Sequence, residues 1–190
     1  YYTVGQYMKE VKDVSKAMAA AGDSYICDEY LNAMGSPEAE SVYVLHDLNN
    51  DGIEEFFIGL KFNYDIPYYV IYDVYTWKDG RAYQLMRGIG YRNGSCKICE
   101  NGVIEDNYSG SAWDGQTLYH ILPEGGIELE TIDSVSSRRD GTVQSYYHWN
   151  ELIDENSLQT ILEQYQPESV TYVDCNRETI EQLRLSGIRK

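Results

Sequence analysis

The sequence predicts an α+β fold with an N-terminal helix, an antiparallel meander sheet over about residues 41–148, and C-terminal helices packed on that sheet. The apolar residues have a helical period at both ends of the chain and switch to short β-rich runs in the middle. Turn signals separate those runs, and no helical pattern lies between them, which argues against parallel βαβ units. Blocks of helix, sheet and helix are typical of the α+β class.

The length and charge of the chain limit what it can be. A chain of 190 residues predicts a single domain, 1–190, that can bury a proper core. A formal net charge of −16 makes nucleic acid and anionic membrane surfaces poor partners, because both attract basic patches. No apolar run approaches the roughly 18–20 residues that span a bilayer, so we expect no transmembrane segment. The sequence does not indicate an oligomeric state.

The first predicted element is a helix over about residues 4–21. Apolar residues recur there at three- and four-residue spacing: Val4, Met8, Val11, Val14 and Met18. Gly22 is a plausible C-terminal stop for this helix. Residues 23–40 are mixed in character and contain the stretch GSPEAE, so we expect a short helix followed by a loop.

The middle of the chain predicts the sheet. Turn signals recur between strand-like runs: NNDG at 49–52, KDG at 78–80, ENG at 100–102, EGG at 124–126 and RDG at 139–141. The runs between them, such as YYVIYDVYTW, are rich in Tyr, Val, Ile and Trp. That run is apolar on both of its faces, which predicts a central strand covered on both sides.

Helices are predicted again over about residues 156–186. One apolar stripe contains Leu158, Ile161, Leu162 and Tyr165. Asn156 is the candidate N-cap of this helix, and Pro167 closes it. The stretch NRETIEQLRLSG then predicts a last helix, with Asn176 as its cap and Gly187 after its end.

One loop between two predicted strands carries oxygen ligands at alternate positions. In HDLNNDGIEEF, Asp47, Asn49 and Asp51 occupy positions one, three and five, and Gly52 follows at six. Calcium takes roughly six to eight oxygen ligands, and short Asp and Asn side chains in a tight loop can all turn inward. We therefore expect a structural calcium ion held by Asp47, Asn49, Asp51, the Ile53 carbonyl and Glu55, with water filling the remainder.

The same loop has a second interpretation that needs no metal. Asn and Asp side chains bond to their own backbone, so Asn-Asn-Asp-Gly also makes a stable bare turn. A catalytic role for these acids is a third reading. Ile58 at position twelve cannot supply the bidentate acid of an EF-hand, and the flanks predict strands rather than helices.

The pattern Asp47-x-Asn49-x-Asp51-Gly52-x-x-Glu55 resembles the calcium loops of FG-GAP and VCBS-type repeats, as in integrin-like propellers. In that group the ion sits in a hairpin between two strands, and the ninth position is more often Asp than Glu. The loop occurs once here, so a whole propeller is not expected. Residues 41–86, from YVLHDLNNDGIEEFFIG to IYDVYTWKDGRAYQL, are also similar to uncharacterised exported proteins and lipoproteins of Gram-positive bacteria. The likeness implies an extracellular location and no particular activity.

Four cysteines form an even set: Cys27, Cys96, Cys99 and Cys175. Their pattern allows two disulfides with three possible connectivities, or four buried structural thiols. A zinc site would need two further ligands, and no second CxxC is present. A thioredoxin-like motif should open a helix, whereas this CxxC leads into the turn ENG. We therefore expect structural disulfides in an oxidising compartment.

Aromatic residues are candidates for ligand binding, since amphipathic rings offer contact area at low entropy cost. The chain has 19 tyrosines, many of them in strand-like runs. The candidates are Tyr75, Trp77, Tyr146, Tyr147 and Trp149. Core packing is the alternative role for these rings.

The sequence supports two classes of function. The first is a secreted or surface-anchored, non-enzymatic module that is stabilised by calcium and binds a glycan or an extracellular protein. The second is an extracellular hydrolase that acts on cell-wall or dietary polymers with acids that the sequence cannot pair. No G-x-S-x-G, H-E-x-x-H or P-loop motif is present, and we assign no catalytic residue. The chain opens on YYTVGQ without Met, so we expect it to derive from a longer precursor whose signal or anchor segment preceded it.

Overall fold

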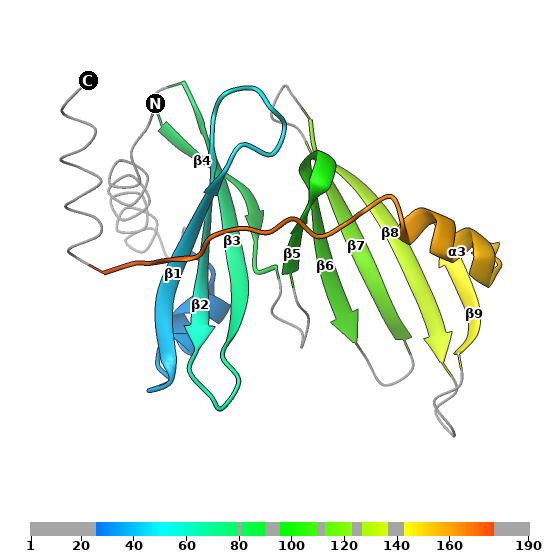
Figure 1. Ribbon diagram of the computed structural model, residues 1–190, viewed down its shortest axis with the longest axis horizontal. Coiled ribbons are helices and arrows are strands. Elements are labelled where there is room, and N and C mark those ends of the chain that lie inside the picture. Colours follow the sequence, from blue (N-terminus) through cyan, green and yellow to red (C-terminus); the bar gives the residue numbers. More distant parts are fainter. Residues whose placement is uncertain are drawn as a thin grey trace. The chain divides into compact units, whose positions relative to one another are not determined.

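The computed structural model describes residues 26–79, 81–89, 96–109, 113–122, 127–136 and 143–176 (Figure 1). These residues belong to two compact units. Unit 1 contains residues 1–89 and 170–190, and unit 2 contains residues 90–169. The expectation of a single domain stays a prediction, because two compact units can belong to one domain.

Unit 1 is built on a five-stranded antiparallel sheet with the order β11-β1-β2-β3-β4. Its elements are α2 (Asp28–Ala33), β1 (Ala39–His46), β2 (Glu55–Phe62), β3 (Tyr68–Lys78), β4 (Arg81–Arg87) and β11 (Val173–Asp174). Residues 70–77 of β3 are all buried, which confirms the prediction of a strand covered on both faces. The core consists largely of aromatic and aliphatic side chains from β2 and β3, among them Phe56, Ile58, Tyr72, Tyr75 and Trp77.

Unit 2 is a six-stranded antiparallel sheet with the order β10-β9-β8-β7-β6-β5. Its elements are β5 (Cys96–Cys99), the 3-10 turn η1 (Glu100–Gly102), β6 (Val103–Ser109), β7 (Trp113–Ile121), β8 (Ile127–Ser136), β9 (Val143–His148), β10 (Glu151–Ile153) and α3 (Glu155–Leu162). Leu158 of α3 packs with Cys99, Val103, Leu118 and Ile132 of the sheet in a small core. The N-cap of α3 is Asp154, whose Oδ1 accepts a hydrogen bond from the backbone N–H of Ser157 at 2.7 Å.

The prediction of an α+β fold is wrong for the described residues, which are mostly β. They form two antiparallel sheets in place of one meander, and their two helices span only six and eight residues. The sequence marks where strands end, but it does not show that β4 and β5 belong to different sheets. The predicted helices over about 4–21 and after Asn176 lie outside the described residues.

The antiparallel arrangement itself is confirmed by every strand pairing in the described part of the chain. The turn residues that the sequence predicts allow the chain to reverse direction between neighbouring strands. Asn50, Asp79 and Asn101 all have positive φ, between 52° and 65°, at turns that the sequence marks with Asn or Asp. No helix in these ranges is long and apolar enough to cross a membrane.

Candidate functional site

The loop between β1 and β2 is closed by its own side-chain oxygens. Asp47 Oδ1 and Oδ2 accept hydrogen bonds from the backbone N–H groups of Asp51 and Gly52, at 3.1 and 2.9 Å. Asn49 Oδ1 also accepts from the Asp51 N–H, at 3.1 Å, and Asp51 Oδ1 accepts from the Ile53 N–H, at 2.7 Å. Gly52 has a φ of 87°, a conformation that glycine adopts without strain. Three of the predicted ligands therefore turn their oxygens into one tight loop.

Glu55, the fourth predicted side-chain ligand, is buried beside that loop and is only 1% exposed. Its Oε2 accepts a hydrogen bond from the Leu48 N–H and its Oε1 accepts one from the Thr76 hydroxyl, both at 3.0 Å. Burial is the main cause that raises the pKa of Glu55 to about 7. The two hydrogen bonds lower it in part, and the negative charges of Asp51 and Asp47 raise it further.

The loop fits calcium in its chemistry and only partly in its arrangement. Carboxylate and amide oxygens are the donors that calcium prefers, and an oxygen that accepts one amide hydrogen bond keeps a second lone pair. The carboxylate of Glu55, however, is turned to Leu48 and Thr76. Across the described ranges, no three or more His, Cys, Asp or Glu side chains are gathered to hold a metal ion. The bonds of Asp47, Asn49 and Asp51 also satisfy the bare-turn interpretation, so the calcium ion stays a prediction.

The predicted aromatic ligand residues do not form one surface. Tyr75 and Trp77 are buried in the core of unit 1. Tyr146 and Tyr147 are half-buried on β9 of unit 2, and Trp149 is exposed in the turn that follows. Tyr75 and Trp77 therefore contribute to packing, and the ligand role of Tyr146, Tyr147 and Trp149 stays a prediction.

An exposed aromatic cluster that the sequence analysis did not identify lies at the turn between β2 and β3. We call it the hairpin tip and define it as Phe62, Tyr64, Ile66 and Tyr68. The rings of Phe62, Tyr64 and Tyr68 are nearly parallel, with centroids 5.1–6.2 Å apart and interplanar angles of 7–19°. Figure 1 shows this turn and the 47–54 loop at opposite ends of β2.

The hairpin tip is among the most exposed apolar features of the described residues. Ile66 is 82% exposed, Tyr64 51% and Tyr68 47%. A shallow, open hollow of about 680 Å³ is lined there by Glu38, Asn63, Tyr64, Asp65 and Ile66. The signal in the sequence was NYDIPYY, which puts apolar residues directly into a turn where few neighbours can cover them.

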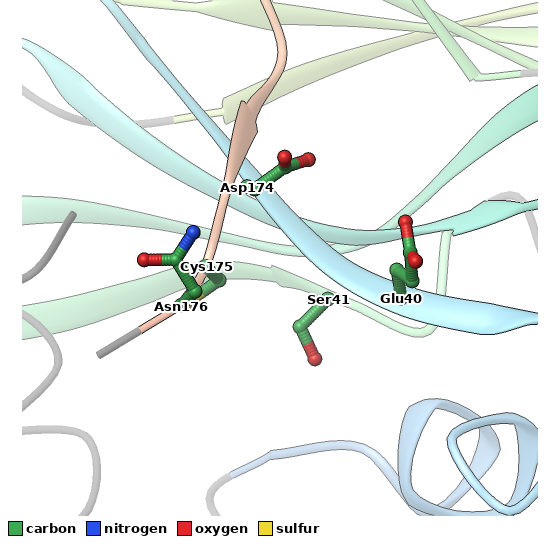
Figure 2. Close-up of a pocket in the computed structure, with 5 residues that line it drawn as sticks. All are labelled: Glu40, Ser41, Asp174, Cys175 and Asn176. Carbon is green, nitrogen blue, oxygen red and sulfur yellow. The ribbon is translucent and has the colours of Figure 1, made fainter. Parts of the chain in front are cut away.

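A second hollow, of about 330 Å³, lies where β11 pairs with β1 (Figure 2). Its lining is Glu40, Ser41, Asp174, Cys175 and Asn176. The Cys175 N–H donates to the Ser41 carbonyl at 2.8 Å, and burial raises the pKa of the Cys175 thiol. A protonated thiol is a weak nucleophile, so this hollow offers no evident covalent chemistry.

The four cysteines carry free thiols, so the predicted disulfides are not present. Cys96 and Cys99 lie three residues apart on β5. Because side chains alternate along a strand, the two thiols point to opposite faces of the sheet. Cys27 is buried in the core of unit 1 and Cys175 packs against it. Burial raises the pKa of Cys27 to about 12 and that of Cys99 to about 11, which fits structural rather than reactive thiols.

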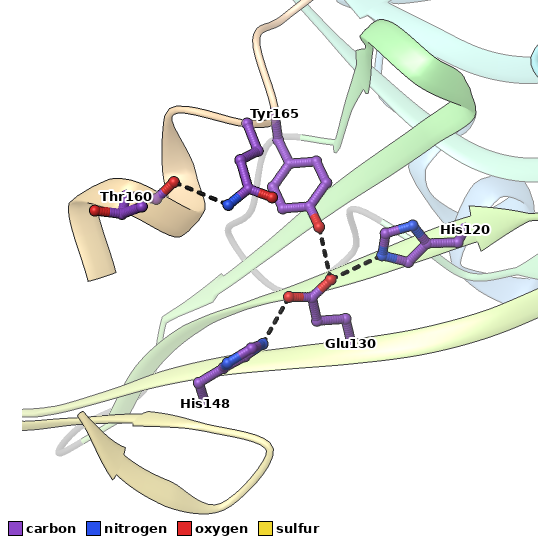
Figure 3. Close-up of polar contacts among 6 residues, drawn as sticks. His120, Glu130, His148, Thr160 and Tyr165 are labelled. Carbon is purple, nitrogen blue, oxygen red and sulfur yellow. Dashed lines mark hydrogen bonds and ion pairs between the residues drawn. The ribbon is translucent and has the colours of Figure 1, made fainter. Parts of the chain in front are cut away.

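Unit 2 contains a polar cluster around Glu130 of β8 (Figure 3). Glu130 Oε2 accepts hydrogen bonds from His120 Nε2 at 2.9 Å and from the Tyr165 hydroxyl at 2.8 Å. Its Oε1 lies 2.7 Å from His148 Nε2. An ionised carboxylate can only accept, so each histidine must carry its proton on Nε2. His120, Glu130 and His148 face the same side of the sheet, because Glu130 lies diagonal to both across β7, β8 and β9.

The pKa of Glu130 reflects these contacts. Burial alone would raise it, but the hydrogen bonds from Tyr165, His120 and His148 outweigh burial, and the pKa is lowered. The pKa of Tyr165 is raised to about 12, first by burial and then by its bond to the Glu130 carboxylate. No local pattern in the sequence marks this cluster, because the register between β7 and β8 is what places His120 opposite Glu128, two residues from Glu130.

Replacing Tyr165 by phenylalanine is expected to lower the free energy of unfolding by about 1–2 kcal/mol at neutral pH, because the variant loses a hydrogen bond to a charged acceptor. The lowered pKa of Glu130 means that its contribution is present above the ordinary glutamate range and is lost as the pH falls through the folded-state pKa. The wild type and Tyr165→Phe should therefore converge in acid. Urea titrations at several pH values measure this, with Tyr147→Phe as the control; a difference that persists in acid would contradict it.

No protein-family model matches the chain, and no curated protein or solved structure matches it either. The resemblance to FG-GAP and VCBS-type loops and to exported Gram-positive proteins therefore stays a prediction.

Proposed function

We propose that the chain is a secreted or surface-anchored, non-enzymatic module that binds a glycan or protein ligand and is stabilised by calcium at the 47–55 loop. The observation that carries the proposal is the hairpin tip. Soluble proteins rarely leave neighbouring large apolar side chains in water without a use for them. Here three rings and an isoleucine gather around one turn, and Tyr64, Ile66 and Tyr68 are all exposed.

The 47–55 loop supports the calcium part of the proposal. It concentrates Asp47, Asp51 and Glu55 within a few residues, and the charges of the first two already disfavour ionisation of the third. A divalent cation would offset that repulsion. Asp47, Asn49 and Asp51 would hold the ion through side-chain oxygens, with the Ile53 carbonyl as a further donor. A stabilising ion of this kind suits an extracellular module, where calcium is plentiful.

Calcium is expected to raise the melting temperature of the wild type by about 3–6 °C at millimolar concentration. An extracellular site with a dissociation constant near 10⁻⁴ M contributes roughly 1.4 kcal/mol by mass action, which corresponds to a shift of that size in a domain of this length. Magnesium should be a poor substitute, because it demands a compact octahedron and keeps its waters.

The variant Asp51→Ala tests whether the 47–55 loop is responsible for the calcium-induced rise in melting temperature. The change removes a charged ligand and the bond to the Ile53 N–H, so most of the calcium-induced rise should disappear. Asp65→Ala, an exposed acid at the other end of β2, is the matched control and should keep the full rise. Thermal melts in calcium, magnesium and chelator decide the question. Identical wild-type melts in calcium and chelator would leave the loop as a bare turn.

Ligand binding should depend on the hairpin tip. A double variant, Tyr64→Ser with Tyr68→Ser, changes two exposed rings and should fold like the wild type. The wild type is expected to bind members of a glycan array or of a displayed random-peptide library, and the double variant should lose that binding. If neither collection yields binding that depends on the tip, the proposed function is refuted.

The hydrolase alternative rests on two buried acids. Glu105 of β6 and Glu130 of β8 both pair with Leu118 of β7, so they face the same side of the sheet. Leu118 is buried between them, and Glu105 is already bound by Lys97, Asn107 and Gln116. A general acid needs a raised pKa, whereas that of Glu130 is lowered. Release of soluble sugar from cell-wall polymers by the wild type, and not by Glu130→Gln, would favour the hydrolase.

A further inference from the structure

We propose that the ligand of the hairpin tip is a protein whose surface offers an apolar recess bordered by lysine or arginine side chains. This inference rests on the proposed function and assigns the chemical class of its ligand. Three properties of the tip support this inference: the identity of its most exposed residue, the sign of the charges around it, and the geometry of its rings.

The most exposed residue of the tip is aliphatic. Ile66 stands 82% exposed between Asp65 and Pro67, and no other large hydrophobic side chain of the described residues is as exposed. A branched aliphatic group offers a sugar neither a flat stacking face nor a hydrogen bond. It fits an apolar recess in a protein, where burial of an isoleucine is strongly favourable. The tip therefore matches a protein surface better than a glycan.

The charges around the tip are negative. Glu38 and Asp65 line the hollow together with Asn63, and no described basic residue lines it. The nearest lysine along β2, Lys61, is directed to Glu40, with 3.5 Å between Nζ and Oε2. An approaching surface would meet two carboxylates beside which the described part of the chain places no basic residue, so a basic rim is electrostatically complementary. The same charges, with the net charge of −16, oppose contact with anionic lipid.

The three rings of the tip are packed together and also suit cations. Phe62 is nearly buried and lies almost parallel to Tyr64 and Tyr68, at 6.2 and 5.1 Å between centroids. Exposed tyrosine faces attract ammonium and guanidinium groups, and arginine most of all. Rings that are already packed together lose little side-chain freedom on binding.

The test is selection of short random peptides displayed on phage against the immobilised wild-type chain. The peptides enriched should combine an aliphatic or aromatic residue with two or more Lys or Arg residues. The most enriched sequence, synthesised, serves as the probe for calorimetry. Ile66→Ser should weaken its binding at least about tenfold, because most of an isoleucine contact is lost. Asp65→Lys should weaken it by about fivefold or more at low salt and less at high salt.

Matched variants in unit 2 control for general surface effects. Leu152→Ser removes an apolar side chain that is 69% exposed on β10, and Glu163→Lys reverses an exposed charge after α3. Both should leave binding of the peptide within about twofold of wild type, since surface changes away from a site are near neutral.

Each other outcome overturns the inference, and the outcomes separate it from the proposed function. Enriched peptides without a basic bias, or binding that Ile66→Ser leaves intact, would refute the basic-rimmed partner. Glycan binding that is lost with Tyr64→Ser and Tyr68→Ser would keep the proposed function and refute the inference. Binding to phosphatidylcholine vesicles with phosphatidylserine, lost in Ile66→Ser, would assign the tip to a membrane surface. Absence of any binding that depends on the tip would refute both.

Discussion

Replacing Gly59 by alanine is expected to lower the free energy of unfolding of unit 1 by at least about 3 kcal/mol. A Cβ at this position would lie 2.3 Å from the Val70 carbonyl oxygen and 3.2 Å from Ile71 Cα. Both are backbone atoms of the neighbouring strand, so no side chain can rotate away to make room. Gly59 also stands where the register between β2 and β3 shifts, with Gly59 opposite Ile71 and Ile58 opposite Asp73. One methyl group must therefore displace a strand in the centre of the sheet.

Urea unfolding monitored by tryptophan fluorescence measures the effect. Gly35→Ala is the matched control, because its new Cβ meets a single carbonyl oxygen, that of Asn32, at 3.2 Å in an exposed turn. That variant should change the free energy of unfolding by less than about 1 kcal/mol. Equal losses in Gly59→Ala and Gly35→Ala would show that the close approach of the two strands is not a constraint.

Replacing Asp73 by leucine should cost unit 1 about 3–5 kcal/mol, because it removes a buried acceptor from several donors at once. Asp73 is fully buried on β3. Its Oδ2 accepts from the Cys27 N–H and its Oδ1 from the Gly88 N–H, both at 3.0 Å. The Tyr75 hydroxyl adds a weaker bond at 3.4 Å. Leucine has a similar volume but would leave the buried Cys27 N–H and the partly buried Gly88 N–H without this acceptor.

The conservative variant Asp73→Asn separates shape from hydrogen bonding. The asparagine keeps one acceptor oxygen but turns an amide N–H toward one of the donors. The loss in the free energy of unfolding should therefore lie between zero and the loss in Asp73→Leu. Burial is the main cause that raises the pKa of Asp73, and the bonds from Cys27 and Gly88 lower it in part. The charged form is thus costly in the folded state, so the wild type should lose stability as the pH rises from the usual aspartate range through the raised pKa of Asp73. Asp73→Asn does not titrate at this position, so the difference in stability between it and the wild type should narrow over that range. The same loss in both variants at every pH would contradict this account.

The sequence predicted the strands of unit 1 well where turn chemistry and burial agreed. Asn50 and Gly52 have the positive φ values that the turn NNDG implies, and β3 is buried on both faces as its composition indicates. The division into two sheets was not predictable, because the alternation of side chains marks strands but not their partners. The structural role of Asp73 was not predictable either. This buried acid in an apolar strand is stabilised by hydrogen bonds from Cys27 and Gly88, which lie far from it along the chain.

The candidate sites also differ in whether local spacing or only the folded structure reveals them. The loop residues Asp47, Asn49 and Asp51 were found because their spacing is local, and their oxygens do converge on one turn. The rings of Tyr75 and Trp77 take the core-packing role that the sequence left open beside ligand binding, because composition does not distinguish an exposed ring from a buried one. The partners of Glu130 lie on the two neighbouring strands, β7 and β9, and in the segment that follows α3. Only the pairing register of the strands and the position of that segment bring them together.

The pairing of β11 with β1 has a consequence for how the chain is made. Val42 pairs with Asp174, although all of unit 2 lies between them in the sequence. Unit 2 is therefore an insertion into unit 1. All of unit 2 must be synthesised before β11 can pair with the edge of β1. Until then the β1 edge offers unpaired amides to any other nascent chain. Unit 2, which is continuous, can fold earlier, whereas a chain truncated before residue 170 would leave that edge of the sheet permanently open.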